Sequence, residues 1–310
     1  MLSVSIAGAG IAGQVLHREL TLGGIPSRLV DTEAFPREKV CGGALQGDSW
    51  EYLNSIFKIS TKAKTLSSIN HFWKGKRISR IRLEVPMVYV SRFVLDDVFY
   101  SQQKPLEVDP KESIHVIATG VQRQRTKGEW AGFQSPIEPV EELEMHYGKG
   151  IYLGITPTFE NQSHAAFLVK KSLFRSLDEL RLLIKKELGL TVRGPLKGTR
   201  IIDYEAPSSE ELAIGDAKLV THPFLGLGMK HAILSARLMA KLISEDRVKD
   251  YSSVHRRLFR KYRLASLMAG KIYESPLHFM ARPLLSNPGI FQSAYRWLHH
   301  SRVAARLESC

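Results

Sequence analysis

Cysteine is almost absent from this chain, which carries only Cys41 and Cys310 among its 310 residues. Two cysteines cannot form the disulfide framework of a small secreted domain, so we expect a reducing environment and a cytoplasmic location. No apolar run approaches the roughly 18 residues that a spanning helix needs. No basic segment precedes an apolar one at the start, which predicts no signal peptide. The 11 histidines follow no familiar ligand spacing, so we predict no metal.

The 31 acidic residues are fewer than the 44 lysines and arginines, so the formal net charge is +13. Many of the positive charges lie late, in the segment 255–263 (HRRLFRKYR). Such a segment is typical of a solvated basic face or of a peripheral contact with a membrane, and the sequence leaves both open. No aromatic stacking platform or nucleic-acid motif accompanies the charge, so we expect no nucleic acid as a partner.

Apolar segments of strand and helix type alternate along the chain. Parallel-type strands are expected at 2–8, 27–31, 114–118 and 211–214, and antiparallel strands at 66–90, 130–133, 141–146, 151–155, 165–169 and 199–204. Helices are expected at 11–23, 47–57, 92–101, 172–188, 227–243 and 248–270, with short helices in 276–300.

This order predicts an α/β fold of mixed α+β character, because blocks of antiparallel strands interrupt the parallel type. One domain built from several pieces, with another inserted, explains it better than two consecutive domains. We predict a discontinuous Rossmann-like nucleotide-binding domain (1–45, 91–125 and 206–245), an inserted antiparallel-sheet substrate domain (46–90 and 126–205) and a helical C-terminal region (246–310).

The first strand leads into a glycine-rich turn, Gly8-Ala9-Gly10-Ile11-Ala12-Gly13. Its glycines allow close approach to a pyrophosphate, and the helix that begins near Ile11 directs its positive end toward the same group. Asp31 ends the second strand, where a carboxylate can accept hydrogen bonds from a ribose. The turn therefore predicts a dinucleotide site.

A second glycine-rich region lies near the other end of the chain. A predicted strand ends at Gly215-Asp216, and Pro223 and Gly226-Leu227-Gly228 precede the next helix. The aspartate can bind a sugar-like hydroxyl, and the glycines let the helix N-terminus approach an electron-rich group. Between the two regions come the loop Phe35–Gly43 and the pair Ser91-Arg92.

In this order the motifs resemble the FAD-dependent oxidoreductases of the p-hydroxybenzoate hydroxylase fold, over residues 3–243. Phe35-Pro36-Arg37, Lys39, Cys41-Gly42 and the strand Tyr152–Pro157 resemble the geranylgeranyl reductase-like branch. The resemblance implies FAD-binding roles for Gly8, Gly10, Ile11, Ala12, Gly13, Asp31, Arg92, Gly215, Asp216, Pro223, Gly226 and Gly228, with Cys41, Gly42 and Gly43 on the substrate side of the ring.

The resemblance implies a flavoenzyme that reduces a C=C bond of a hydrophobic, lipid- or isoprenoid-like substrate by hydride transfer. Cys41 and Tyr152 are the candidate catalytic residues, His222 could tune the flavin or donate a proton, and NAD(P)H is a candidate electron donor. The apolar tail could line a tunnel or pack in the core, through Phe279, Met280, Leu284, Leu285, Phe291, Tyr295 and Trp297.

Two alternatives stay open. One is a flavin-dependent monooxygenase that hydroxylates an aromatic or polyketide-like substrate with NAD(P)H and O2. The other is a degenerate flavin-binding protein without turnover, because Thr119, Leu227 and the short segment 100–113 depart from the pattern of the family. The Trp-x-Trp-x-Ile-Pro strand of halogenase relatives is missing, which disfavours halogenation.

Overall fold

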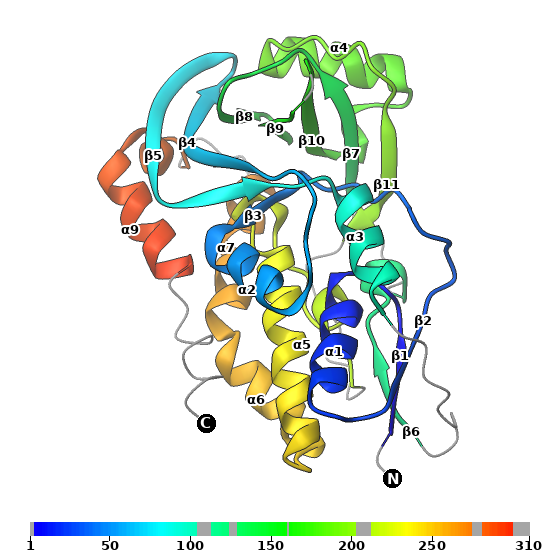
Figure 1. Cartoon of the computed structure of the whole chain (residues 1–310). Coiled ribbons are helices and arrows are strands. Elements are labelled where there is room, and N and C mark those ends of the chain that lie inside the picture. Colours follow the sequence, from blue (N-terminus) through cyan, green and yellow to red (C-terminus); the bar gives the residue numbers. More distant parts are fainter. Residues whose placement is uncertain are drawn as a thin grey trace.

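A computed structural model describes residues 3–103, 113–123, 129–159, 161–202, 212–274 and 281–299. A small parallel sheet lies below a large curved sheet, with helices packed around both (Figure 1). The small sheet has the order β2-β1-β6, with both strand pairs parallel. Its strands are β1 (Ser3–Ala7), β2 (Ser27–Val30) and β6 (Ser113–Ile117). Ala213 adds one parallel bridge to Ile117, where a fourth strand was predicted.

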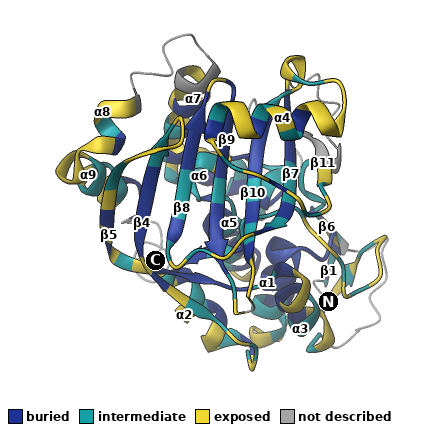
Figure 2. Cartoon of the chain, turned by 90° about the horizontal axis from the view of Figure 1, so that it is seen from above, coloured by how far each residue is buried: buried dark blue, intermediate teal, exposed yellow. Residues whose placement is uncertain are grey.

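The large sheet has eight strands in the order β11-β7-β10-β9-β8-β4-β5-β3, most of which Figure 2 shows side by side. Neighbouring strands of this sheet pair antiparallel, except that β4 and β8 pair parallel. The strands are β3 (Ala44–Gln46), β4 (Lys64–Trp73), β5 (Lys76–Tyr89), β7 (Trp130–Ile137), β8 (Leu143–Gly148), β9 (Ile151–Pro157), β10 (Ser163–Lys170) and β11 (Lys197–Ile202).

The two faces of the large sheet have different tasks, because side chains alternate between the faces of a strand. On β9, Ile151, Leu153 and Ile155 pack with α4 (Leu177–Leu188) on the outer face. The intervening Tyr152 turns to the inner face, toward the rest of the molecule. Helix α4 begins later than predicted because the Ser176 side chain caps it, accepting a hydrogen bond from the Glu179 N–H (3.1 Å).

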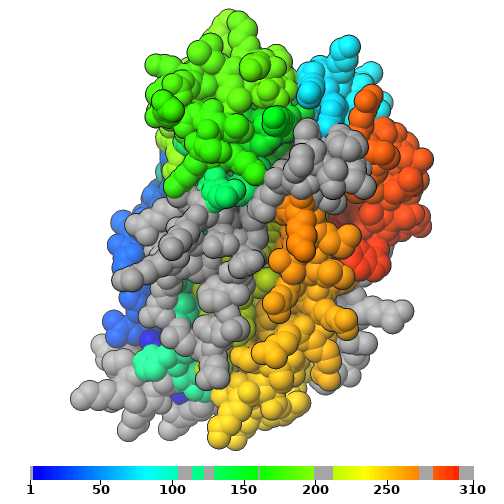
Figure 3. Space-filling model, turned by 180° about the vertical axis from the view of Figure 1, so that it is seen from behind, coloured from blue at the N-terminus to red at the C-terminus, as the bar shows by residue number. Residues whose placement is uncertain are grey.

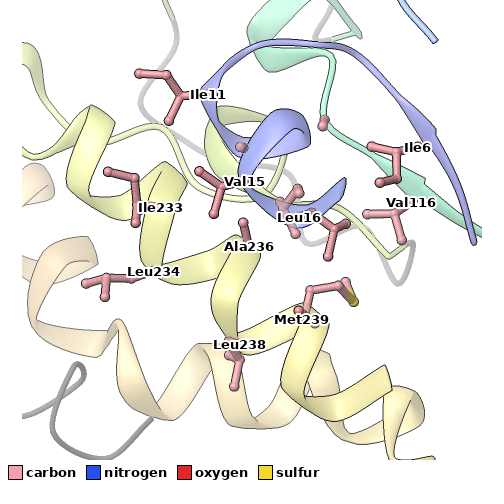
Figure 4. Packing of buried hydrophobic residues seen from close by; sticks show 14 of the residues in the cluster. Ile6, Ile11, Val15, Leu16, Val116, Ile233, Leu234, Ala236, Leu238 and Met239 are labelled. Atoms are coloured by element: carbon pink, nitrogen blue, oxygen red, sulfur yellow. The ribbon is translucent and has the colours of Figure 1, made fainter. Parts of the chain in front are cut away.

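Two helices bury the small sheet. Helix α1 (Ile11–Leu22) packs along α5 (Gly228–Ser244). Figure 4 shows Val15 and Leu16 of α1 between the strand residues Ile6 and Val116 and the small Ala236 of α5. All five side chains are at most 1% exposed. This core fixes the glycine-rich turn that opens α1 against the start of α5.

The remaining helices follow the prediction with one correction. A single helix was predicted over 248–270, but the chain breaks at Phe259, between α6 (Tyr251–Leu258) and α7 (Arg260–Glu274). The break lets the buried rings of Phe259 and Tyr262 both contact His231 of α5. The other helices are α2 (Gly47–Ile56), α3 (Arg92–Ser101), α8 (Ala281–Ser286) and α9 (Pro288–His299), and α8 and α9 lie beside β5.

Candidate functional site

A cavity of about 450 Å³ lies between the glycine-rich turn of the small sheet and the inner face of the large sheet. Segments that are distant in the sequence meet there, from the start of α1 to the start of α5 and on to α9. The predicted site residues that line it are Gly10, Ile11, Ala12, Cys41, Gly42, Gly43, Arg92, Tyr152, Gly215, Asp216, Pro223, Gly226 and Gly228.

Three predicted residues do not line this cavity: Gly8, Gly13 and Asp31. Gly8 has a φ of +109°, and a Cβ on it would lie 2.5 Å from the Ala118 carbonyl oxygen. A Cβ on Gly13 would lie 1.9 Å from the Gly8 carbonyl oxygen. These two glycines are therefore required for the close packing of β1, α1 and β6, and a contact with pyrophosphate is not what fixes their identity.

Asp31 has other partners than a ribose in this structure. Its carboxylate accepts hydrogen bonds from the backbone N–H of Ala9 (2.6 Å) and of Glu33 (3.0 Å), and it pairs with the Arg37 guanidinium (3.1 Å). The aspartate thus ties the end of β2 to the glycine-rich turn. Its proposed role toward a ribose stays a prediction, and a sugar hydroxyl there competes with Arg37.

The cavity is open and cationic beside the start of α1. A Cβ on Gly10 would meet no atom closer than the side-chain nitrogens of Arg37 and Lys39, each at 3.9 Å. Backbone N–H groups at a helix N-terminus together with flanking cations form a site for an anion such as a phosphate. The position that the sequence assigns to a pyrophosphate therefore lies at a helix N-terminus with two cationic side chains beside it, of which Arg37 also pairs with Asp31 and Glu33.

Arg92 and Asp96 form a buried ion pair in the first turns of α3. The guanidinium donates two hydrogen bonds to the carboxylate, at 2.9 and 2.7 Å. Burial works against the charge of Arg92, but the Asp96 carboxylate and the nearby Cys41 outweigh it and raise the pKa of Arg92 above its ordinary value. Arg92 therefore stays protonated at the cavity wall, with its charge paired to the Asp96 carboxylate.

Asp216 faces these cations from the opposite segment. Burial raises the pKa of its carboxyl, while Lys39 and then Arg92 act to lower it. Gly215, just before it, has a φ of +59°, and a Cβ there would lie 2.9 Å from that of Ala12. The Gly215 N–H donates to the Ser235 hydroxyl on α5 (2.9 Å). This close packing brings the carboxylate to the same end of the cavity as Gly10.

The loop at Cys41 and Gly42 is held by side chains of the large sheet. The Cys41 N–H donates to the Gln134 side-chain oxygen (3.2 Å), and its carbonyl accepts from His164 Nε2 (2.8 Å). The Thr156 hydroxyl donates to the Gly42 carbonyl (3.0 Å). Three strands, β7, β9 and β10, thus fix a loop that lines the cavity.

The segment before α5 is fixed in a similar way. The Gln46 side-chain amide donates to the carbonyl of Gly226 (2.6 Å), whose φ is +62°. The neighbouring His222 N–H donates to the Ser266 hydroxyl (3.1 Å). The His222 side chain is fully buried and does not line the cavity, and burial lowers its pKa to about 3. It is therefore neutral at neutral pH and positions the segment.

Away from the cations, the cavity is an apolar, aromatic chamber. The rings of Tyr152 and Phe224 meet edge to face, with their centroids 6.2 Å apart. Burial, and then the proximity of Cys41, raises the pKa of Tyr152 above its ordinary value. Leu284, Leu285, Phe291 and Tyr295 of the tail also line the chamber, as the tunnel hypothesis requires. Trp297 does not, being 55% exposed, and Phe279 and Met280 lie outside the described residues.

A histidine–tyrosine pair in this chamber was missed by the sequence reasoning. His71 Nδ1 lies 2.8 Å from the Tyr147 hydroxyl, and both residues line the cavity. Burial lowers the pKa of His71 to about 4, so the ring is neutral, and its Nε2 has no hydrogen-bond partner among the described residues. The two-residue spacing of Ile69 and His71, which both line the cavity, is the signal that could have assigned His71 to the inner face.

In the part of the chain that the structure describes, no group of three or more His, Cys, Asp and Glu side chains could hold a metal ion. No helix of those residues is long and apolar enough to cross a membrane.

No protein-family model matches the chain, and no curated protein matches it. Solved structures do match over nearly the whole length. A flavoprotein/dehydrogenase from Cytophaga hutchinsonii is 13% identical with a TM-score of 0.72, covering 99% of this chain and 98% of that one. Pseudomonas aeruginosa PqsL in complex with 2-aminobenzoylacetate is 13% identical with a TM-score of 0.68, covering 95% and 99%. The flavin-dependent brominase Bmp2 is 17% identical with a TM-score of 0.65, covering 99% and 97%.

These structures define the class to which the fold belongs. The chain has the mixed α/β fold of the flavin-dependent monooxygenases and related flavoproteins, with a Rossmann-like region and a curved, mainly antiparallel sheet. The predicted fold class is therefore confirmed. The likeness to these structures extends to the broader fold only. Membership of the geranylgeranyl reductase-like branch therefore stays a prediction. One fold supports several chemistries, so the function has to be argued from the site.

Proposed function

We propose that this protein is an FAD-dependent monooxygenase that acts on a hydrophobic, largely uncharged small molecule with NAD(P)H and O2. One observation carries the proposal: a single cavity joins the cationic, glycine-lined end at Gly10 and Asp216 to an apolar chamber around Tyr152. PqsL, a probable FAD-dependent monooxygenase of the same fold, supports the choice of reaction.

The residues of the cationic end fit FAD. A Cβ on Gly10, Gly42 or Gly226 would meet no atom closer than 3.8 Å, so packing within the protein does not require glycine at these three positions, and all three line the cavity. When bound, FAD supplies the electron transfer and oxygen chemistry that the side chains cannot. In this proposal 1–45, 91–125 and 206–245 hold FAD, 46–90 and 126–205 bind the substrate, and 246–310 forms the helical C-terminal region.

The side chains divide the remaining work. Lys39 would balance part of the phosphate charge, Arg92 would remain paired with Asp96 beside it, and Asp216 would accept hydrogen bonds from the sugar-like part of the cofactor. The apolar walls exclude water from the reacting groups, which limits wasteful loss of a reactive intermediate. These roles depend on position and charge, and the positions come from the loops described above.

The lining also indicates the class of substrate. The charged lining residues, Lys39, Arg92 and Asp216, are all assigned to the cofactor end. The chamber offers aromatic rings and neutral hydrogen-bonding groups, among them His71 and Tyr147. A carboxylate placed there would lose its hydration without a matching cation, which is costly. We therefore propose an aromatic or otherwise apolar substrate with a neutral polar group.

The reductase hypothesis keeps one specific support. Cys41 lines the cavity with Tyr152, where either could donate the proton that accompanies hydride addition to a C=C bond. One argument for a degenerate protein was the departure from the family pattern at Leu227. This argument is weaker because Leu227 is fully buried in the core and so has a packing role.

The visible spectrum of the purified protein, followed by NADPH oxidation with ¹⁸O2, tests the proposal. We expect a yellow protein that NADPH bleaches and that places labelled oxygen in an aromatic product. Turnover under anaerobic conditions with a donor other than NAD(P)H would support the reductase instead. A colourless protein that takes up no added FAD would refute both enzymes.

A further inference from the structure

The outward face of α7 has an unusual composition for a surface helix. Its exposed stripe, at helical spacing, contains three apolar side chains, Leu264, Leu267 and Met268, with exposed fractions of 50%, 37% and 54%. Cations flank them along the same stripe. We call these six residues the α7 outer face: Arg260, Arg263, Leu264, Leu267, Met268 and Lys271. A helix whose only role is to cover a core carries mostly polar residues on its solvent side.

Basic residues outnumber acidic ones along α6 and α7, where the sequence has one acid, Glu274, the last residue of α7. No Asp or Glu occurs from Tyr251 to Tyr273, and Arg256 and Arg257 of α6 are also exposed. Exposed cations on a soluble surface are usually interspersed with acids, which limits single-sign fields. An apolar centre with basic flanks is the composition of helices that lie in the headgroup region of anionic membranes.

A second helix adds to the same side of the molecule. The Lys261 ammonium donates to the Trp297 carbonyl of α9 (3.0 Å), and the Trp297 side chain is 55% exposed. Figure 3 shows α6, α7 and the α8–α9 segment together on one face. Tryptophan favours the membrane interface because its ring is apolar and its N–H is polar.

We infer that the protein docks on anionic membrane surfaces through the α7 outer face and Trp297. A second copy of the chain is a poorer partner, because each copy carries a net charge of +13 and the faces would repel each other. Anionic lipid offers both complementary charge for the arginines and an apolar layer for Leu264 and Met268.

The surface shares only Arg260 and Arg263 of the α7 outer face with the segment 255–263 that the sequence singled out. His255, Phe259 and Tyr262 of that segment are buried against α5 and cannot reach a membrane. Helix α9 also contributes Phe291 and Tyr295 to the wall of the chamber. Docking would therefore place one wall of an apolar cavity next to a reservoir of apolar molecules.

Flotation with lipid vesicles tests this inference. The full-length protein is mixed with vesicles of phosphatidylcholine and phosphatidylglycerol (about 3:1) or of phosphatidylcholine alone, at low salt. We expect flotation with the anionic vesicles only, weakened by high salt. Each arginine near such a surface contributes about fivefold in affinity. Arg260→Ser/Arg263→Ser and Leu264→Ser/Met268→Ser should each lower vesicle affinity at least about tenfold.

Matched variants on α4 control for general effects of charge and exposed apolar area. Leu177 and Leu182 are 46% and 67% exposed, and Lys185 and Lys186 are exposed on the same helix. Leu177→Ser/Leu182→Ser and Lys185→Ser/Lys186→Ser should float like the wild type. Equal losses for the α4 and α7 variants, absence of flotation, or a dimer abolished by the α7 apolar variant would each overturn the inference.

The flavin in each fraction separates this inference from the proposed function. Protein that floats but is colourless and takes up no added FAD refutes the flavoenzyme and leaves the docking surface standing. Yellow protein that stays with the soluble fraction refutes the docking surface and leaves the flavoenzyme standing.

Discussion

Four buried histidines make the stability of this protein sensitive to mild acid. His71, His222, His231 and His255 are each at most 5% exposed. Burial lowers the pKa of His71 to about 4 and of His222 and His231 to about 3. Burial, together with His231 and Lys218, lowers that of His255 further. In the folded protein all four rings therefore stay neutral well below neutral pH.

The sign of the effect follows from the unfolded chain, where a histidine titrates near 6.5. Below that pH the histidines are protonated in the unfolded state but stay neutral in the folded state. The free energy of unfolding therefore falls as the pH falls, until the pKa of the folded state is reached. At about pH 5, which is about 1.5 units below the unfolded pKa, each histidine lowers the free energy of unfolding by about 2 kcal/mol, at about 1.36 kcal/mol per pH unit. Four rings together remove about 8 kcal/mol, comparable with the whole stability of many domains.

The His231–His255 pair allows a direct test. Their Nε2 atoms lie 3.0 Å apart between α5 and α6. In the variant His231→Leu/His255→Leu, the loss of unfolding free energy between about pH 7.5 and about pH 5 should shrink by about 4 kcal/mol. Urea denaturation at the two pH values, with equal flavin occupancy, measures this difference.

The buried, non-titrating Leu238 of α5 provides the control, and Leu238→Ala should lower stability equally at the two pH values. The reasoning is refuted if the double leucine variant loses as much stability in acid as the wild type, or if the wild type is no less stable at the lower pH.

Two further predictions concern the cofactor end of the cavity. Gly13→Ala should destabilise the fold by about 3 kcal/mol or more, because its Cβ would lie 1.9 Å from the Gly8 oxygen. Gly10→Ala, with no atom within 3.9 Å, should keep its thermal midpoint and lose flavin; equal midpoints for the two variants would contradict this. Asp216→Ala should lower the flavin content of purified protein sharply, as read from visible absorbance, whereas full occupancy would remove Asp216 from the site.

Much of the fold could be predicted because its signals are local. The turn Gly8–Gly13 requires glycine for backbone reasons that any strand–turn–helix unit of this kind shares, and the period-2 pattern of 151–155 marks a sheet with two different faces. The break at Phe259 could not be predicted, because the pattern continues through it and only packing against His231 of α5 decides it.

The site was predictable as a set of segments and less so as a set of contacts. The ion pair between Arg37 and Asp31 could not be predicted from the sequence, because it depends on the path of the loop between the two residues. His71 and Tyr147 are 76 residues apart, and their pairing requires β4 and β8 to be neighbours. The parallel pairing of these two strands, which are far apart in the sequence, is a tertiary contact that local sequence patterns do not predict.

The attachment of Cys41 and Gly42 to Gln134, Thr156 and His164 has a consequence for engineering. Anyone who grafts the large sheet of another flavoprotein onto this scaffold, in order to change its specificity, replaces the three side chains that hold the loop. A chimaera that keeps the native loop but not its tethers should lose cofactor alignment along with the old specificity. The loop and the sheet must therefore be exchanged as one cassette.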